Sequence, residues 1–203
     1  MKRPEPPPDA PVSRETEAAL REYLRLLLLW NRRINLVAAL PEAEAWSRHV
    51  LDAWQLLPLL PPAGALADLG SGAGLPGLVI AIGRQAEIHL VEADRRKAAF
   101  LLEASRALGL SHVRVHPSRI EAARLPPLAA VTARALAPLP DLLSHAARLL
   151  APDGIAVFPK GRTAGAELTA AAPHWFMQVE RFASRTDPDA TILRLSEIRP
   201  AGA

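Results

Sequence analysis

The stretch LADLGSGAGLPGLVIAI, residues 66–82, decides the fold of this chain. Four of the eleven glycines lie within it, between an apolar run that enters and an apolar run that leaves. Glycine allows positive φ angles and leaves backbone amides uncovered, so a ligand can approach the main chain closely. The pattern predicts a buried strand, a tight turn and a helix opened by Pro76, with a ligand beside the helix N-terminus.

Strand-like and helix-like segments alternate on both sides of this stretch. Strands are expected at 65–70, 87–93, 111–117, 128–136 and 155–161, and helices at 75–83, 94–110, 139–154 and 165–172, with a helical turn near Ile120. An antiparallel pair, 174–183 and 190–198, is expected at the C-terminal end. Such alternation indicates an α/β fold, a Rossmann-like doubly wound, mainly parallel sheet with an antiparallel C-terminal edge strand.

Two helices are expected before the sheet. Ser13 predicts the N-cap of a helix that reaches about Arg33, and Pro41 opens a second helix that reaches about Leu57. The Pro-rich residues 1–12 are predicted to form a flexible arm. We therefore divide the chain into this arm, an N-terminal helical extension over 13–60 and a Rossmann-like domain over 61–203.

The composition excludes several classes of protein. With no cysteine, a disulfide framework and cysteine-ligated zinc are excluded, and the histidines have no metal-ligand spacing. No apolar run reaches the length of a membrane span, and the N-terminus lacks the apolar region of a secretory signal. We expect a cytoplasmic protein, a monomer, with no metal and no membrane partner.

The charge distribution points to an anionic partner. The net charge is +3, and residues 65–150 carry ten basic and seven acidic side chains, which accounts for the whole excess. Basic surfaces of this kind suit nucleic acids and other anions.

The glycine stretch is followed by an acidic residue at the spacing of nucleotide-binding folds. GAGLPG, residues 72–77, matches G-x-G-x-x-G, and Glu92 ends the next predicted strand, 20 residues after Gly72. A carboxylate there can accept both hydroxyls of an adenosine ribose. The ligand of such a loop is a dinucleotide or S-adenosylmethionine, and the alternative is a tight turn without a ligand.

Three features favour S-adenosylmethionine as the cofactor. Asp68 precedes the first glycine by two residues, as in the DLGSGxG form of the methyltransferase loop, where the acid organises the loop. One sheet and two N-terminal helices account for this sequence, so we expect no second domain of the kind most dehydrogenases use for substrate, and the C-terminal strand pair is typical of class I methyltransferases. A nucleotide (NAD)-dependent oxidoreductase and a non-catalytic RNA-binding module remain the alternatives.

Six motifs in order give the chain a specific resemblance. They are YLRLLLLWNRRINLVAAL (23–40), RHVLDA (48–53), DLGSGAGLPG (68–77), SRIE (118–121), ARA (133–135) and PKG (159–161). On these motifs the chain resembles the glucose-inhibited division protein B family of bacterial small-subunit rRNA guanine-N7 methyltransferases. The resemblance extends from about Tyr23 to Leu195.

The resemblance implies a function and a set of residues. The product would be N7-methylguanine at guanine 527, in the 530 loop of 16S rRNA. The cofactor side of the site would comprise Asp68, Gly70, Gly72, Gly74, Leu75, Glu92, Ile120, Glu121 and Arg134. Within this set, Glu92 would hold the ribose, Ile120 and Glu121 would lie beside the adenine, and Arg134 would face the active cleft.

The chemistry of guanine N7 explains why no catalytic acid or base is assigned. N7 carries an unprotonated in-plane lone pair at neutral pH, so it can attack a sulfonium methyl group directly. The enzyme then has mainly to align the nucleophile, the methyl group and the sulfur.

Basic side chains are the candidates for RNA contact. Arg48, His49, Lys160 and Arg162 are assigned to the substrate side, with Arg32, Arg33 and the RRK run at 95–97 as further phosphate contacts. Each has a plainer interpretation: Arg48 and Asp52 are four residues apart and could form a surface ion pair, and the RRK run could be a solvated helix face.

Overall fold

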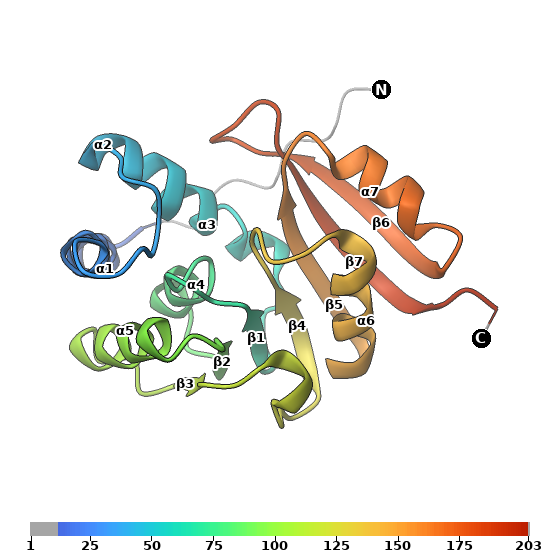
Figure 1. The fold of residues 1–203 in the computed structure, drawn as a ribbon, viewed down its shortest axis with the longest axis horizontal. Coiled ribbons are helices and arrows are strands. Elements are labelled where there is room, and N and C mark those ends of the chain that lie inside the picture. The colour runs from blue at the N-terminus through green and yellow to red at the C-terminus, as the bar shows by residue number, and fades with distance from the viewer. Residues whose placement is uncertain (1–11, 203) are drawn as a thin grey trace.

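A seven-stranded sheet forms the centre of the computed structural model, which describes residues 12–202 (Figure 1). The strand order is β3-β2-β1-β4-β5-β7-β6. The strands are β1 (Leu66–Leu69), β2 (Ile88–Val91), β3 (Val113–His116), β4 (Leu128–Thr132), β5 (Leu150–Lys160), β6 (Trp175–Ala183) and β7 (Thr191–Pro200). Neighbours among β1 to β5 pair in parallel, and β7 is antiparallel to both β5 and β6. The predicted α/β class and the antiparallel C-terminal part of the sheet are confirmed.

Helices cover both faces of the sheet (Figure 1). On one face, α4 (Gly77–Gly83) and α5 (Arg95–Ala107) lie against the strands, and α1 (Arg14–Asn31) packs onto both helices. On the other face lie α6 (Leu139–Leu149) and α7 (Ala164–Ala171). The predicted turn near Ile120 is a single 3-10 turn, η3 (Ile120–Ala122). Apolar side chains between each layer and the sheet form two cores, which hold the strand ends in place.

The first helix has the expected start. Ser13 is its N-cap, because the Ser13 hydroxyl accepts a hydrogen bond from the Thr16 backbone amide at 3.2 Å. Leu20, Leu24 and Leu27 recur on one face and are buried against the sheet-covering helices. The flexible arm predicted over 1–12 falls on residues that, Val12 excepted, lie outside the described part of the chain.

The second predicted helix is continuous but irregular. It consists of α2 (Glu42–Ala45), a π-helical turn η1 (Trp46–Leu51) and α3 (Asp52–Trp54), and a 3-10 turn η2 (Leu57–Leu59) follows. In a π-helix the backbone hydrogen bonds join residues five apart instead of four apart. The surface ion pair considered for Arg48 and Asp52 is not formed. Asp52 pairs with Arg134 instead.

Two predicted boundaries are wrong. The strand expected at 128–136 ends at Thr132, so Arg134 lies in the loop that follows β4. The helix expected at 139–154 ends at Leu149, and β5 begins at Leu150, five residues before the predicted strand. Leu150 pairs with Leu128 of β4, and the register then shifts before Ile155 pairs with Ala130. The residues APDG therefore form an irregularity within the strand, because Pro152 cannot continue a helix and Gly154 fits closely beside β4.

None of the helices over residues 12–202 is long and apolar enough to cross a membrane.

Candidate functional site

The glycine turn after β1 has a backbone that only glycine adopts easily. Gly70, Gly72 and Gly74 have φ angles of +64°, +53° and +78°. A Cβ atom on Gly74 would collide with the Leu78 side chain, whereas a Cβ on Gly72 would have its nearest neighbour 3.7 Å away. Gly72 is therefore the place where the turn presents bare backbone to open space. This is the feature expected of a loop against which a ligand lies.

Asp68 supports the turn from inside the fold. Its carboxylate is fully buried and accepts hydrogen bonds from the Gly77 amide at 3.0 Å and from the Thr132 hydroxyl at 3.2 Å. Burial raises the pKa of Asp68 to about 7, although these hydrogen bonds act against the rise. Because it has no exposed surface, Asp68 shapes the loop and is not placed to touch a ligand.

Glu92 joins the glycine turn to the end of β2. One carboxylate oxygen accepts a hydrogen bond from the Gly72 amide at 2.8 Å, and the other accepts one from the Asp94 amide at 2.7 Å. The side chain thus lies directly beside the open part of the turn, where the predicted ribose would be. Each oxygen retains a lone pair, so the predicted role remains available to it.

Tyr23 is a site residue that sequence reasoning missed. It lies on α1, is completely buried, and donates its hydroxyl to the Ala73 carbonyl at 2.7 Å, between two glycines of the turn. Burial raises its pKa far above the usual range, so it stays a neutral donor. The available signal was that the only tyrosine of the chain occupies a core position in an apolar helix stripe, where its hydroxyl needs a partner.

A cleft of about 1070 Å³ opens beside the turn, at the carboxyl ends of β4 and β5. Its lining includes Arg48, His49, Arg134 and Lys160, which are four of the predicted site residues. Leu136 connects the cleft to the turn, because a Cβ built on Gly70 would lie 2.5 Å from Leu136 Cδ1. The glycine turn and the basic cleft are therefore neighbouring parts of one site.

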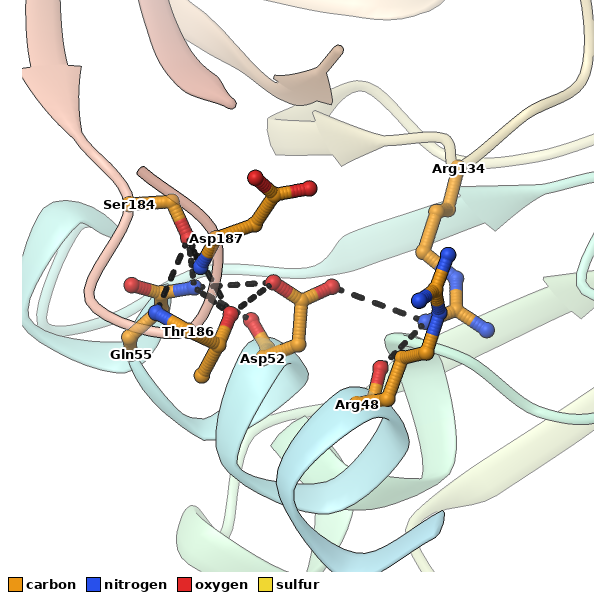
Figure 2. Close-up of polar contacts among 7 residues, drawn as sticks. All are labelled: Arg48, Asp52, Gln55, Arg134, Ser184, Thr186 and Asp187. Carbon is orange, nitrogen blue, oxygen red and sulfur yellow. Dashed lines mark hydrogen bonds and ion pairs between the residues drawn. The ribbon is translucent and has the colours of Figure 1, made fainter. Parts of the chain in front are cut away.

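A polar network closes one side of this cleft (Figure 2). The Asp52 carboxylate accepts hydrogen bonds from Thr186 Oγ1 at 2.7 Å and Gln55 Nε2 at 2.9 Å, and its other oxygen lies 3.5 Å from Arg134 Nη1. Arg134 also donates to the Arg48 carbonyl at 3.3 Å. The buried Gln55 accepts from the Arg185 amide at 2.9 Å. Three separate segments are thus held together: the π-helical region, the β4–α6 loop and the β6–β7 loop.

The two predicted basic residues after β5 differ in their surroundings. Lys160 is 10% exposed and donates to Glu167 Oε2 at 2.8 Å and to the Ala137 carbonyl at 3.0 Å. It therefore connects α7 with the β4–α6 loop beside the cleft. Arg162 is exposed, is not part of the cleft lining, and lies 3.3 Å from the Asp189 carboxylate. Of the two, only Lys160 belongs to the cleft.

His49 faces the cleft with its hydrogen-bonding capacity unused. The residue is 5% exposed, and neither ring nitrogen has a hydrogen-bond partner of good geometry in the described part of the chain. Burial lowers its pKa, the nearby Arg134 lowers it further, and the backbone of Arg48 opposes both. At neutral pH the ring is therefore uncharged, with one nitrogen that can donate and one that can accept a hydrogen bond.

Residues 16–188 match the family model described as rRNA small subunit methyltransferase G. The chain belongs to this family. Two curated relatives named Ribosomal RNA small subunit methyltransferase G are 55% identical over 192 residues in Rhodospirillum centenum and 57% identical over 198 residues in Acidiphilium cryptum. The alignments cover 94% and 95% of this chain and 88% and 90% of the relatives.

Solved structures confirm the fold of this methyltransferase family member. An O-methyltransferase from Bacillus cereus in complex with SAH has a TM-score of 0.59 at 15% identity, over 89% of this chain and 91% of that one. A SAM-dependent methyltransferase from Aquifex aeolicus has a TM-score of 0.58 at 14% identity, over 75% and 92%. The predicted class I methyltransferase fold is confirmed.

The remaining predicted cofactor residues lie at the same edge of the sheet. Leu75 is buried in the turn, and Ile120 and Glu121 form the 3-10 turn η3 beyond the end of β3. Ile120 packs against the core, whereas the Glu121 side chain is 68% exposed and lies 3.7 Å from His145. Their contact with adenine stays a prediction. Over residues 12–202 no group of three or more His, Asp or Glu side chains could hold a metal ion.

Proposed function

We propose that this protein is an S-adenosylmethionine-dependent methyltransferase that modifies N7 of a guanine in 16S rRNA of the small ribosomal subunit, namely guanine 527 in the 530 loop. One observation supports the proposal above all: an open glycine turn lies next to a basic cleft in a chain that belongs to the rRNA small subunit methyltransferase G family. Because its substrate is ribosomal RNA, we place the protein in the cytoplasm.

The residues of the turn fit the methyl donor. The bare backbone at Gly72 admits a ligand, and Glu92 presents a carboxylate beside it, as binding of a ribose diol requires. When bound, S-adenosylmethionine supplies an electrophilic methyl group on a sulfonium. Gly70 and Leu136 would then border its methionine end, next to the cleft.

The cleft residues would receive the target base. The reaction forms a bond between N7 and the methyl carbon and breaks the carbon–sulfur bond, whose electron pair stays on sulfur. No proton moves, so His49 is not required as a base and borders the cleft as an uncharged side chain. Arg48 and Arg134 supply positive charge for the flanking phosphates, and the base enters the cleft splayed out of its stack.

Titration calorimetry tests the cofactor assignment directly. We expect saturable binding of S-adenosylmethionine and S-adenosylhomocysteine and none of NADH. Heat with NADH alone would instead support an oxidoreductase. RNA binding without any nucleotide ligand would support a non-catalytic RNA-binding module.

Mapping of N7-methylguanine in 16S rRNA tests the substrate assignment. RNA from cells with and without the gene should differ at guanine 527, and purified protein should restore the modification in vitro. An unchanged pattern would remove 16S rRNA as the substrate while leaving the cofactor result intact.

A further inference from the structure

A second basic cavity lies at the carboxyl edge of the sheet, separate from the cleft. Its volume is about 150 Å³, below the roughly 300–1,000 Å³ of small-molecule sites. Its lining is polar and comes from two segments, the turn after α1 and the start of α5, and consists of Arg33, Ile34, Asn35, Asp94, Arg96 and Lys97. A group the size of a single phosphate suits such a space better than a whole nucleotide.

The cations of this cavity are not neutralised by ion pairs. Among residues 12–202, Arg33, Arg96 and Lys97 form no ion pair, and the one carboxylate of the cavity, Asp94, caps α5. Asp94 accepts hydrogen bonds from the Arg96 and Lys97 amides at 2.8 and 3.2 Å, which keep its pKa below the usual range. Three positive charges therefore face one negative charge that is already engaged with the backbone.

Three arginines of α1 and α5 are paired with acidic side chains of their own helix, whereas Arg14 and Arg95 are not. On α1, Arg21 lies 2.6 Å from Glu17 and Arg25 lies 2.8 Å from Glu22, and on α5 Arg106 lies 3.1 Å from Glu103. Moreover, cations in the first turn of a helix oppose its dipole, so their position at the start of α5 costs stability unless an anion binds.

The cavity and the cleft flank the glycine turn. In the sheet, β1, which leads into the turn, lies between β2, which leads into α5, and β4, which leads to Arg134. Neighbouring strands are about 4.8 Å apart, so the ends of β2 and β4 are separated by roughly 10 Å. A single RNA strand following the edge of the sheet would reach both sites within a few nucleotides.

We propose that Arg33, Arg96 and Lys97 bind one backbone phosphate of the RNA substrate, outside the catalytic cleft. This inference rests on the proposed function. It assigns to the turn after α1 and to α5 a role in holding the RNA strand whose target base occupies the cleft. The contact carries no base specificity and fixes the position of the strand.

The salt dependence of RNA binding tests the phosphate site. We compare Arg33→Ala/Lys97→Ala with Arg25→Ala/Arg106→Ala, which removes one charge each from α1 and α5 but leaves the cavity intact. The probe is a fluorescein-labelled transcript of the 530-loop region, titrated by anisotropy between 50 and 200 mM KCl. Loss of one phosphate contact should lower the slope of log K against log salt by about 1.

The expected difference is specific to the cavity. The affinity deficit of the cavity variant should be largest at 50 mM KCl and shrink by about threefold at 200 mM, while the control follows the wild type. Affinity for S-adenosylmethionine should be unchanged in both. Arg33→Gln/Lys97→Gln repeats the test with side chains of similar length should the alanine variant fold poorly.

Two outcomes overturn the inference, and they are distinguishable. If the cavity variant and the control have equal salt slopes, the inferred phosphate site is refuted. Methylation of 16S rRNA by the wild-type protein would still support the proposed function in that case. If the wild-type protein binds neither the RNA nor S-adenosylmethionine, the proposed function fails and the phosphate site fails with it.

Discussion

The Asp52 carboxylate on the helical extension lies 3.5 Å from Arg134 Nη1 at the end of β4, and the two side chains are only 19% and 22% exposed. Asp52 is bound on its other side by Thr186, so one carboxylate fixes both walls of the cleft. It makes no polar contact with the glycine turn and acts through Arg134 and Thr186 as a positioning residue.

Removal of this carboxylate should impair catalysis more than folding. Asp52→Ala leaves Arg134 without its partner and frees Thr186, so kcat/KM for RNA methylation should fall by about tenfold, the equivalent of 1.4 kcal/mol. Hydrogen exchange should rise at 184–190, and binding of S-adenosylmethionine should change little. Glu180→Ala, which removes an exposed pair with Arg194, is the control. Equal effects of both substitutions would contradict the positioning role.

Substitution of Gly72 should separate folding from ligand binding. Alanine at Gly72 has room but a φ of +53°, so it should cost about 1 kcal/mol of stability. Its methyl group would cover the bare backbone and abolish detectable binding of S-adenosylmethionine. Gly74→Ala should be much more destabilising, because its Cβ collides with Leu78. Urea unfolding measures the stability of the two variants, and calorimetry measures their affinity for S-adenosylmethionine. Strong binding by Gly72→Ala would refute the proposal that the ligand lies against the backbone of Gly72.

The tyrosine of α1 should couple the extension to the ligand. Tyr23→Phe leaves the Ala73 carbonyl without its buried donor and should cost roughly 1–3 kcal/mol of stability. Because the turn becomes less fixed, the affinity for S-adenosylmethionine should fall by several-fold. Leu24→Met, a neighbouring core change, is the matched control and should leave affinity unaltered. Identical ligand affinity in Tyr23→Phe and the wild type would show that the hydrogen bond does not order the turn.

The buried acid behind the turn should impose a pH dependence on folding. The pKa of Asp68 is about 7 in the folded state and near the ordinary aspartate value of 3.8 in the unfolded state, so between these pH values the folded state holds an extra proton. Its contribution to stability is therefore complete below about pH 4 and is lost as pH rises to about 7, by a few kcal/mol. Asp68→Asn should remove this loss. Urea unfolding at pH 4 to 8 measures the free energy of unfolding of the wild type and the variant. The stability of the wild type relative to the variant should decrease as the pH rises from 4 to 7. A difference that is the same at every pH would contradict the prediction.

Local sequence patterns were enough for the parallel part of the fold. Spacing alone predicts the alternation of strands and helices and the Ser13 cap. It also predicts the glycine turn and the position of Glu92, 20 residues beyond Gly72. The boundary between α6 and β5 could not be placed, because it depends on the pairing of Leu150 with Leu128 of β4, a tertiary contact that no local pattern predicts.

The site was only partly predictable for the same reason. The sequence identifies Glu92 and Arg134 as site candidates, yet their partners are set by tertiary packing. Asp52 pairs with Arg134 from the loop after β4, and Lys160 pairs with Glu167 of the following helix. The hydrogen bond of Tyr23 spans 50 residues, beyond the reach of any local pattern.

The bond between Asp52 and Thr186 has a consequence for synthesis of the protein. The two residues are 134 positions apart, so the hydroxyl that completes the cleft leaves the ribosome long after the carboxylate that receives it. Until then the helical extension and the glycine turn can assemble, but the far wall is missing. A nascent chain would thus acquire its cofactor loop before its RNA cleft, and would become competent for RNA only near the end of translation.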